Sequence, residues 1–161
     1  MCIIQMKFKI IPALTVSLFS VFAMSSHATE LDTYLIQKNL IDQNYKIKDQ
    51  KNLDIILAAL SDEDSRVYPV QIDQNTVIEQ MQMSHDHISL QGLITSEDFD
   101  QFAKSVGKEQ TQQYLIKGMI ENCHLIFENE FQRRNPYYVK IKLSSDQKSY
   151  EIKVNNDQCK F

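Results

Sequence analysis

Residues 137–154 read YYVKIKLSSDQKSYEIKV and contain two short strands separated by a polar turn. On each side of the turn, apolar residues alternate with polar or charged ones. A period of two is the pattern of a strand with one buried face and one solvated face. The stretch therefore predicts a β-hairpin in which only the apolar side is covered by the rest of the protein.

A second hairpin is predicted earlier in the chain, over residues 76–84 and 87–95. Both segments alternate in the same way, and the polar tripeptide Ser84-His85-Asp86 lies between them as a turn. Glu79 interrupts the apolar row of the first strand, which predicts that this end lies at the sheet margin.

Helices are predicted before each hairpin. Residues 52–61 carry apolar side chains at i, i+3, i+4 and i+7, with Asn52 as the expected N-cap and residues 61–65 as a polar exit loop. Residues 31–47 are mixed, with a helical start and a short extended end. Together these patterns predict one helix and a less regular segment ahead of the first hairpin.

Between the hairpins, residues 97–106 predict a helix that begins with acidic residues and ends at Gly107. Residues 109–132 predict one longer helix, with Cys123 on its apolar stripe. The predicted fold class is α+β: a small antiparallel sheet of two β-hairpins with helices packed on one face and one disulfide.

The first residues have the composition of a secretory signal peptide. Lys7 and Lys9 precede an uncharged apolar run over residues 10–24, and residues 26–28 supply the small-x-small pattern of a cleavage site. Met6 offers an alternative start to Met1, and a retained N-terminal anchor is the alternative to cleavage. No later stretch is long and apolar enough to predict a membrane span after cleavage.

This pattern divides the chain into a signal peptide (1–28), an N-terminal extension (29–49) and a single α+β domain (50–161). The expected location is the periplasm after cleavage near Ala28, or the outside of the cell if the protein is secreted.

Removal of residues 1–28 leaves two cysteines, Cys123 and Cys159. In an oxidising compartment an even pair predicts one disulfide, and the chain-entropy model assigns such a loop about 3.5–4 kcal/mol of stabilisation. The alternative is a reactive Cys123 thiol beside His124, which requires a lowered thiol pKa and an accessible position.

Composition excludes several classes of function. The chain has 17 basic and 21 acidic residues, so its net charge is −4, and loss of Lys7 and Lys9 leaves 15 − 21 = −6. This balance argues against a nucleic-acid partner, whose phosphates require a basic face. Only 3 glycines make a glycine-rich phosphate loop improbable, and no cofactor is expected.

A short pattern, Pro-x-x-(Val/Ile)-Asp-x-x-Thr, occurs at Pro69, Ile72, Asp73 and Thr76. Together with the hairpins, the helical cysteine and the terminal cysteine, it resembles a diffuse group of small exported bacterial proteins over about residues 50–160. The chain lacks the glycine that such proteins tend to have before and inside the last hairpin. The resemblance implies the fold and the compartment and implies no activity.

Chemistry-bearing residues do not form a recognisable catalytic motif. No Gly-x-Ser-x-Gly or Ser-x-x-Lys signature accompanies the serines and acids, so no catalytic residue is assigned. His85, His87 and His124 are weak metal-ligand candidates because imidazole suits zinc or copper. Their spacing specifies no third or fourth ligand, and no metal site is predicted.

One basic cluster is a candidate interaction surface, because Arg and aromatic residues favour protein interfaces. Its members are Arg133, Arg134, Tyr138, Lys140, Lys142 and Lys153. An ordinary solvated sheet face is the alternative interpretation.

The leading functional prediction is an exported, non-enzymatic protein that binds another macromolecule, most simply a protein. Two alternatives stay open: an immunity protein that neutralises an antibacterial effector acting in the periplasm, and a periplasmic metal-binding protein.

Overall fold

The computed structural model describes residues 28–161, so all of the predicted signal peptide except Ala28 lies outside the described residues. The helices are α1 (Glu30–Gln37), α2 (Gln50–Asp64), α3 (Phe99–Val106), α4 (Lys108–Glu121), α5 (Cys123–Ile126) and α6 (Glu130–Arg134). The strands are β1 (Val70–Asp73), β2 (Thr76–Met83), β3 (His87–Ile94), β4 (Tyr138–Ser144) and β5 (Ser149–Asn155). Two short 3-10 turns, η1 (Ser65–Val67) and η2 (Asn156–Gln158), complete the described elements.

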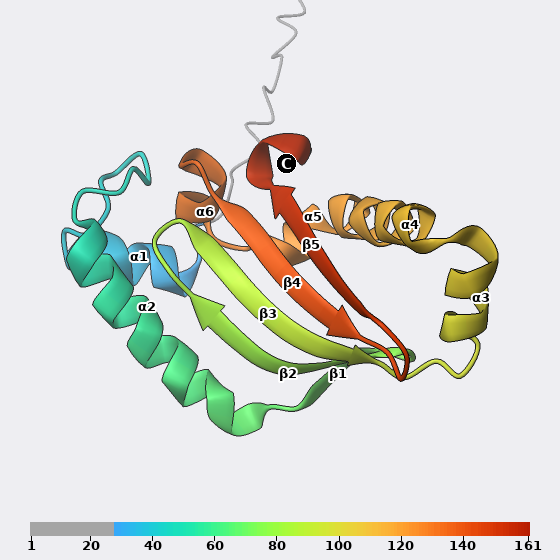
Figure 1. Ribbon diagram of the computed structural model, residues 1–161. Coiled ribbons are helices and arrows are strands. Elements are labelled where there is room, and N and C mark those ends of the chain that lie inside the picture. Colours follow the sequence, from blue (N-terminus) through green and yellow to red (C-terminus); the bar gives the residue numbers. More distant parts are fainter. Residues whose placement is uncertain (1–27) are drawn as a thin grey trace, which may run out of the picture.

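The strands form one five-stranded sheet in the order β1-β2-β3-β4-β5. The predicted α+β class and the two hairpins, β2–β3 and β4–β5, are confirmed. A wholly antiparallel sheet is wrong, because β3 and β4 pair in parallel where the hairpins meet. Two neighbouring parallel strands need a long connection that brings the chain back to the end of the sheet at which the first strand begins. Helices α3 to α6 form this connection between β3 and β4 (Figure 1).

The fifth strand, β1, is a short edge strand that the sequence pattern did not reveal. All four of its residues are exposed, so no alternation of buried and solvated positions marks it. The register of β2 against β3 shifts between Ile78 and Gln80. Glu79 is therefore the extra residue at a bulge, which explains how an acidic residue stands in an otherwise apolar row.

Helix α2 lies against β2 and satisfies part of its unpaired edge. The Met83 N–H donates to Ser61 Oγ (2.9 Å), and the His85 N–H donates to Asp54 Oδ1 (2.7 Å). The predicted exit loop at residues 61–65 is therefore wrong for its first four residues: the helix continues through Asp64, and Ser61 is buried.

The N-terminus of α2 also differs from the prediction. Asp49 is the N-cap, and its carboxylate accepts the Asn52 N–H at 3.1 Å. Asn52 therefore lies inside the first turn of the helix rather than at its cap.

The single helix predicted over residues 109–132 is wrong, because the chain forms α4, α5 and α6 there. Asn122 leaves the helical conformation (φ −113°), and its side chain donates to Gly118 O at 2.8 Å, which satisfies a carbonyl near the end of α4. The apolar spacing persists through the break, so periodicity alone did not reveal it. Gly107 has φ +89° where α3 ends, in agreement with the predicted terminator.

The predicted N-terminal extension, residues 29–49, shares the core of the domain. Leu35, Leu40 and Ile41 are buried in the same cluster as the sheet residues. The described chain from residue 29 onward therefore packs as one unit. The cluster includes Leu53, Leu57, Ile78, Ile88, Phe127, Phe131, Val139, Ile141, Leu143, Ile152 and Val154.

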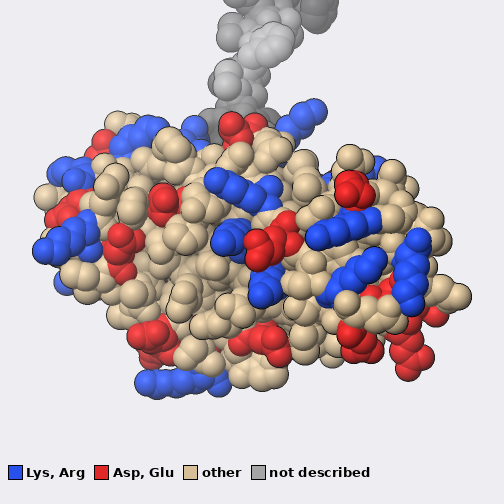
Figure 2. All heavy atoms as spheres, in the orientation of Figure 1, with Lys and Arg blue, Asp and Glu red and all other residues tan. Residues whose placement is uncertain are grey.

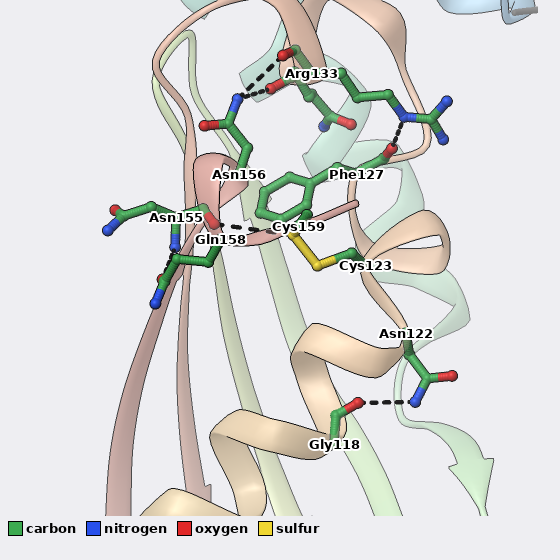
Figure 3. The surroundings of a disulfide bond; sticks show 10 residues. Gly118, Asn122, Cys123, Phe127, Arg133, Asn155, Asn156, Gln158 and Cys159 are labelled. Atoms are coloured by element: carbon green, nitrogen blue, oxygen red, sulfur yellow. Dashed lines mark hydrogen bonds between the residues drawn. A yellow bond between two sulfur atoms is a disulfide. The ribbon is translucent and has the colours of Figure 1, made fainter. Parts of the chain in front are cut away.

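The predicted disulfide is confirmed, since Cys123 and Cys159 are bonded with their Cα atoms 5.8 Å apart. The bond joins the start of α5 to Cys159, the residue directly after η2, and Phe127 packs beside it (Figure 3). Cys123 is 2% exposed, so the structure does not support the alternative of an accessible reactive thiol. The bond attaches the C-terminal end of the chain to the helical connection between the hairpins.

Replacement of both cysteines by alanine should lower the free energy of unfolding by about 3 kcal/mol, because the unfolded chain loses its cross-link. Urea denaturation monitored by circular dichroism measures the change. Unfolding of the unreplaced protein in a thiol reductant provides the matched comparison and should show a similar loss. Equal midpoints for oxidised and reduced protein would contradict a stabilising bond.

Candidate protein-interaction face

The alternation in the second hairpin places charged residues on one side of the sheet. Tyr138, Lys140 and Lys142 lie on one side of β4, while Val139 and Ile141 on the other side enter the core. On β5, Glu151 and Lys153 share the solvated side. We call the surface formed by Tyr138, Lys140, Lys142 and Lys153 the basic face.

Helices flank the sheet and do not lie over the basic face. The strands are seen face on in Figure 1, with α2 along β2 and α4 along β5. Lys and Arg side chains gather over the middle of this view in Figure 2, with acidic side chains among them. The basic face carries three lysines, and Glu151 is the acidic residue beside them on β5, so this area is net positive. The whole chain, by contrast, has a net charge of −4.

Tyr138 is held between neighbouring strands by two ring contacts. The His87 ring from β3 stacks on it with centroids 5.1 Å apart, and the Lys153 ammonium from β5 lies 3.7 Å from its centroid. His87 in turn contacts Asp86 Oδ1 through Nδ1 at 2.7 Å. Partial burial opposes ionisation of Asp86, but the bond to His87 and the charges of His87 and His85 leave the pKa of Asp86 below its ordinary value.

Cross-strand register places like charges opposite each other on the basic face. Lys140 pairs with Lys153 and Lys142 pairs with Glu151. Like charges directly opposite on a sheet destabilise it, and opposite charges stabilise it. Repulsion between Lys140 and Lys153 therefore opposes folding, while the contact of Lys153 with the Tyr138 ring favours it.

The two predicted arginines lie next to the basic face and are engaged by the protein itself. Arg133 donates through Nε to Phe127 O (2.6 Å) and through Nη1 to Glu130, and Arg134 donates through Nε to Glu130. Glu130 is 2% exposed, so both arginines neutralise a buried carboxylate. Only Arg134, with a 56% exposed side chain, keeps much of its guanidinium in solvent.

An open pocket of about 690 Å³ connects the arginines to the basic face. Arg133, Arg134, Tyr138 and Phe161 line it, and the Arg133 guanidinium lies 5.0 Å from the Phe161 ring centroid. Of the six predicted surface residues, Arg133, Arg134 and Tyr138 line this pocket. Lys140, Lys142 and Lys153 lie on β4 and β5 and are not part of its lining. The sequence pattern indicated His87 only as a metal-ligand candidate and gave no signal for Phe161. The parallel register that places His87 opposite Tyr138 comes from the tertiary structure.

A second open pocket, of about 460 Å³, lies at the opposite end of the sheet. Its apolar lining residues are Ile94, Phe99, Leu115 and Leu143, and its polar rim comes from the turn between β1 and β2.

The three histidines do not form a metal site. His85 Nδ1 contacts Asp54 Oδ2 at 2.8 Å, His87 contacts Asp86, and His124 is exposed on α5. Over residues 28–161, no group of three or more His, Cys, Asp or Glu residues lies close enough to hold a metal ion. Two of the three candidates are therefore engaged by carboxylates of the protein.

Within the same residues, every helix is too short or too polar to pass through a lipid bilayer.

Comparison with known proteins gives only distant structural likenesses. The chain matches no protein-family model and no curated protein sequence. A protein from Pseudomonas aeruginosa that is inferred to be secreted is similar in structure, with 9% identity and a TM-score of 0.46 over 69% of this chain and 96% of its own. The pilotin EpsS of the Vibrio vulnificus type 2 secretion system is similar with 11% identity and a TM-score of 0.47, over 70% of this chain and 96% of its own. Likenesses at this level carry no argument about the function of this chain.

Two charge reversals at neighbouring positions should have opposite effects on stability. Lys140→Glu places an acid opposite Lys153 and should stabilise the protein by about 0.5 kcal/mol, whereas Lys142→Glu places an acid opposite Glu151 and should destabilise it by a similar amount. Thermal unfolding at low salt measures both changes, and added salt should reduce them. A change of the same sign in both variants would contradict the cross-strand account.

Proposed function

We propose that this chain is an exported, non-enzymatic protein that binds an acidic region of another protein through its basic face. The observation that carries the proposal is the pairing of Lys140 with Lys153 across β4 and β5, a like-charged pair on an open sheet face. Such a pair costs stability in the isolated protein and becomes favourable when an anionic group approaches both lysines.

Export is supported by two independent features. The sequence of residues 1–28 has the charged start, apolar run and small-x-small end of a signal peptide. The bond between Cys123 and Cys159 requires an oxidising compartment in an ordinary bacterium, since thiols in the cytosol are kept reduced.

The composition of the basic face favours recognition of a protein. Tyr138 presents an aromatic ring whose position is held by His87 and Lys153, so little conformational entropy is lost when a partner contacts it. Long lysine side chains around an aromatic residue give apolar contact together with charge. Because the rest of the chain is acidic, an acidic partner would be oriented toward this face and repelled elsewhere.

The immunity-protein alternative requires a different surface. A basic effector would be repelled by the basic face and attracted to acidic parts of the chain. The location of the contact therefore separates the two proposals.

Site-specific cross-linking in living cells tests the proposal. A photoreactive amino acid at Gln91, which is exposed and pairs with Lys142 across β3 and β4, should form an adduct with a partner protein. The same amino acid at Ala58, on the exposed side of α2, is the matched control and should form none.

The charge reversals distinguish specific from accidental capture. Lys140→Glu should reduce the yield of the Gln91 adduct at least about tenfold although this variant is expected to be the more stable one. Lys142→Glu should reduce it as well. An adduct that survives both substitutions, or that forms only from Ala58, would falsify the proposed basic-face contact.

A further inference from the structure

The carboxylate of Asp32 is buried at the junction between α1 and α6. Its side chain is fully buried and accepts hydrogen bonds from two residues that lie almost a hundred positions later in the chain. Asp32 Oδ2 accepts the Glu130 N–H at 2.8 Å, and Oδ1 accepts the Phe131 N–H at 3.1 Å. The carboxylate therefore holds the N-terminal helix against the first turn of α6.

Asp32 has no cationic side chain to balance its charge in the part of the chain that the structure describes. The ion pairs found there involve Asp54, Asp86, Glu121 and Glu130, and none includes Asp32. Its partners in the described residues are the N–H groups of Thr29, Glu130 and Phe131 and the Thr29 hydroxyl, 3.0 Å from Oδ2. All of these are neutral, so the charge of the buried carboxylate is incompletely compensated.

One nitrogen atom beside Asp32 can acquire a charge. The backbone N–H of Thr29 donates to Asp32 Oδ2 at 3.2 Å, as the return bond of the capping box that begins α1. The Thr29 hydroxyl is placed 2.6 Å from Asn129 Oδ1, so Thr29 is fixed against α6 as well. Its preceding residue, Ala28, is exposed and ends the predicted cleavage motif of residues 26–28.

We propose that Thr29 is the first residue of the processed protein, and that its α-ammonium forms an ion pair with buried Asp32 which locks α1 onto α6. Hydrolysis breaks the Ala28–Thr29 peptide bond; the elements of water supply the hydroxyl of the Ala28 carboxyl group and a hydrogen on the Thr29 amine, which then takes up a proton. The neutral donor already positioned at 3.2 Å thereby becomes a cationic one. This inference rests on the export part of the proposed function and is independent of the basic face.

The other charges around the new ammonium leave Asp32 as its partner. On α1, the Glu30 residue is exposed. On α6, Glu130 is already bound to Arg133 and Arg134. Asn129 and the Thr29 hydroxyl are neutral, so the pair forms between one cation and one anion.

The pairing predicts how stability depends on pH. An α-amino group ordinarily has a pKa of about 7.7–8.0, and an adjacent carboxylate raises this pKa in the folded state. The extra stability is therefore fully present below about pH 7.7 and is lost as the pH rises through the higher folded-state pKa.

The test compares two forms of the protein that differ only at the amino end. One begins with a free amine at Thr29, and the other begins with acetylated Ala28 and keeps a neutral N–H at Thr29. The free-amine form should have a melting temperature higher by about 3–6 °C at pH 6, and the difference should shrink toward zero by pH 10. Equal melting temperatures at pH 6, or a difference that grows with pH, would overturn the ion pair.

Two further measurements keep the outcome unambiguous. In an Asp32→Asn background, the difference between the two amino ends should disappear; if that variant does not fold, the pH series on the unreplaced protein decides by itself. The intact mass of protein recovered from the periplasm should correspond to a start at Thr29. A different first residue would overturn the proposed processing site, and retention of the protein in the cytosol would overturn export. The cross-link at Gln91 tests the basic face separately.

Discussion

The parallel pairing of β3 with β4 is the constraint on which the rest of the fold depends. Two hairpins can share one sheet in this way only if the chain returns from the end of β3 to the start of β4, and the helices α3 to α6 make that return. The strand starts are aligned by short contacts at one end of the sheet. The Tyr138 N–H donates to Asp86 O at 3.1 Å, and the Tyr137 hydroxyl lies 2.8 Å from Ser84 O.

The second half of the helical return is short and is held by bonds to distant parts of the chain. The disulfide attaches the start of α5 to the C-terminal segment, and Asp32 binds the start of α6 to α1. Helices of four and five residues have little stability alone, since helix nucleation is unfavourable. These two attachments therefore provide order that the local sequence does not.

The same arrangement leaves one side of the sheet uncovered. Because the connecting helices and α2 pack with the apolar side, the alternate residues of β4 and β5 face solvent. The Lys140–Lys153 pair concentrates positive charge around Tyr138, and the basic face stays open to solvent.

Local periodicity determined the hairpins at residues 76–95 and 137–154 and the helix around Leu57, because alternation and helical spacing are properties of neighbouring residues. The cysteine count predicted the Cys123–Cys159 bond, because only two cysteines follow the predicted signal peptide. Tertiary structure alone decided that β3 and β4 run parallel and that Asp32 is buried. Both features depend on partners distant in the chain. The residues around a carboxylate do not reveal whether water or a remote backbone N–H will donate to its oxygen atoms.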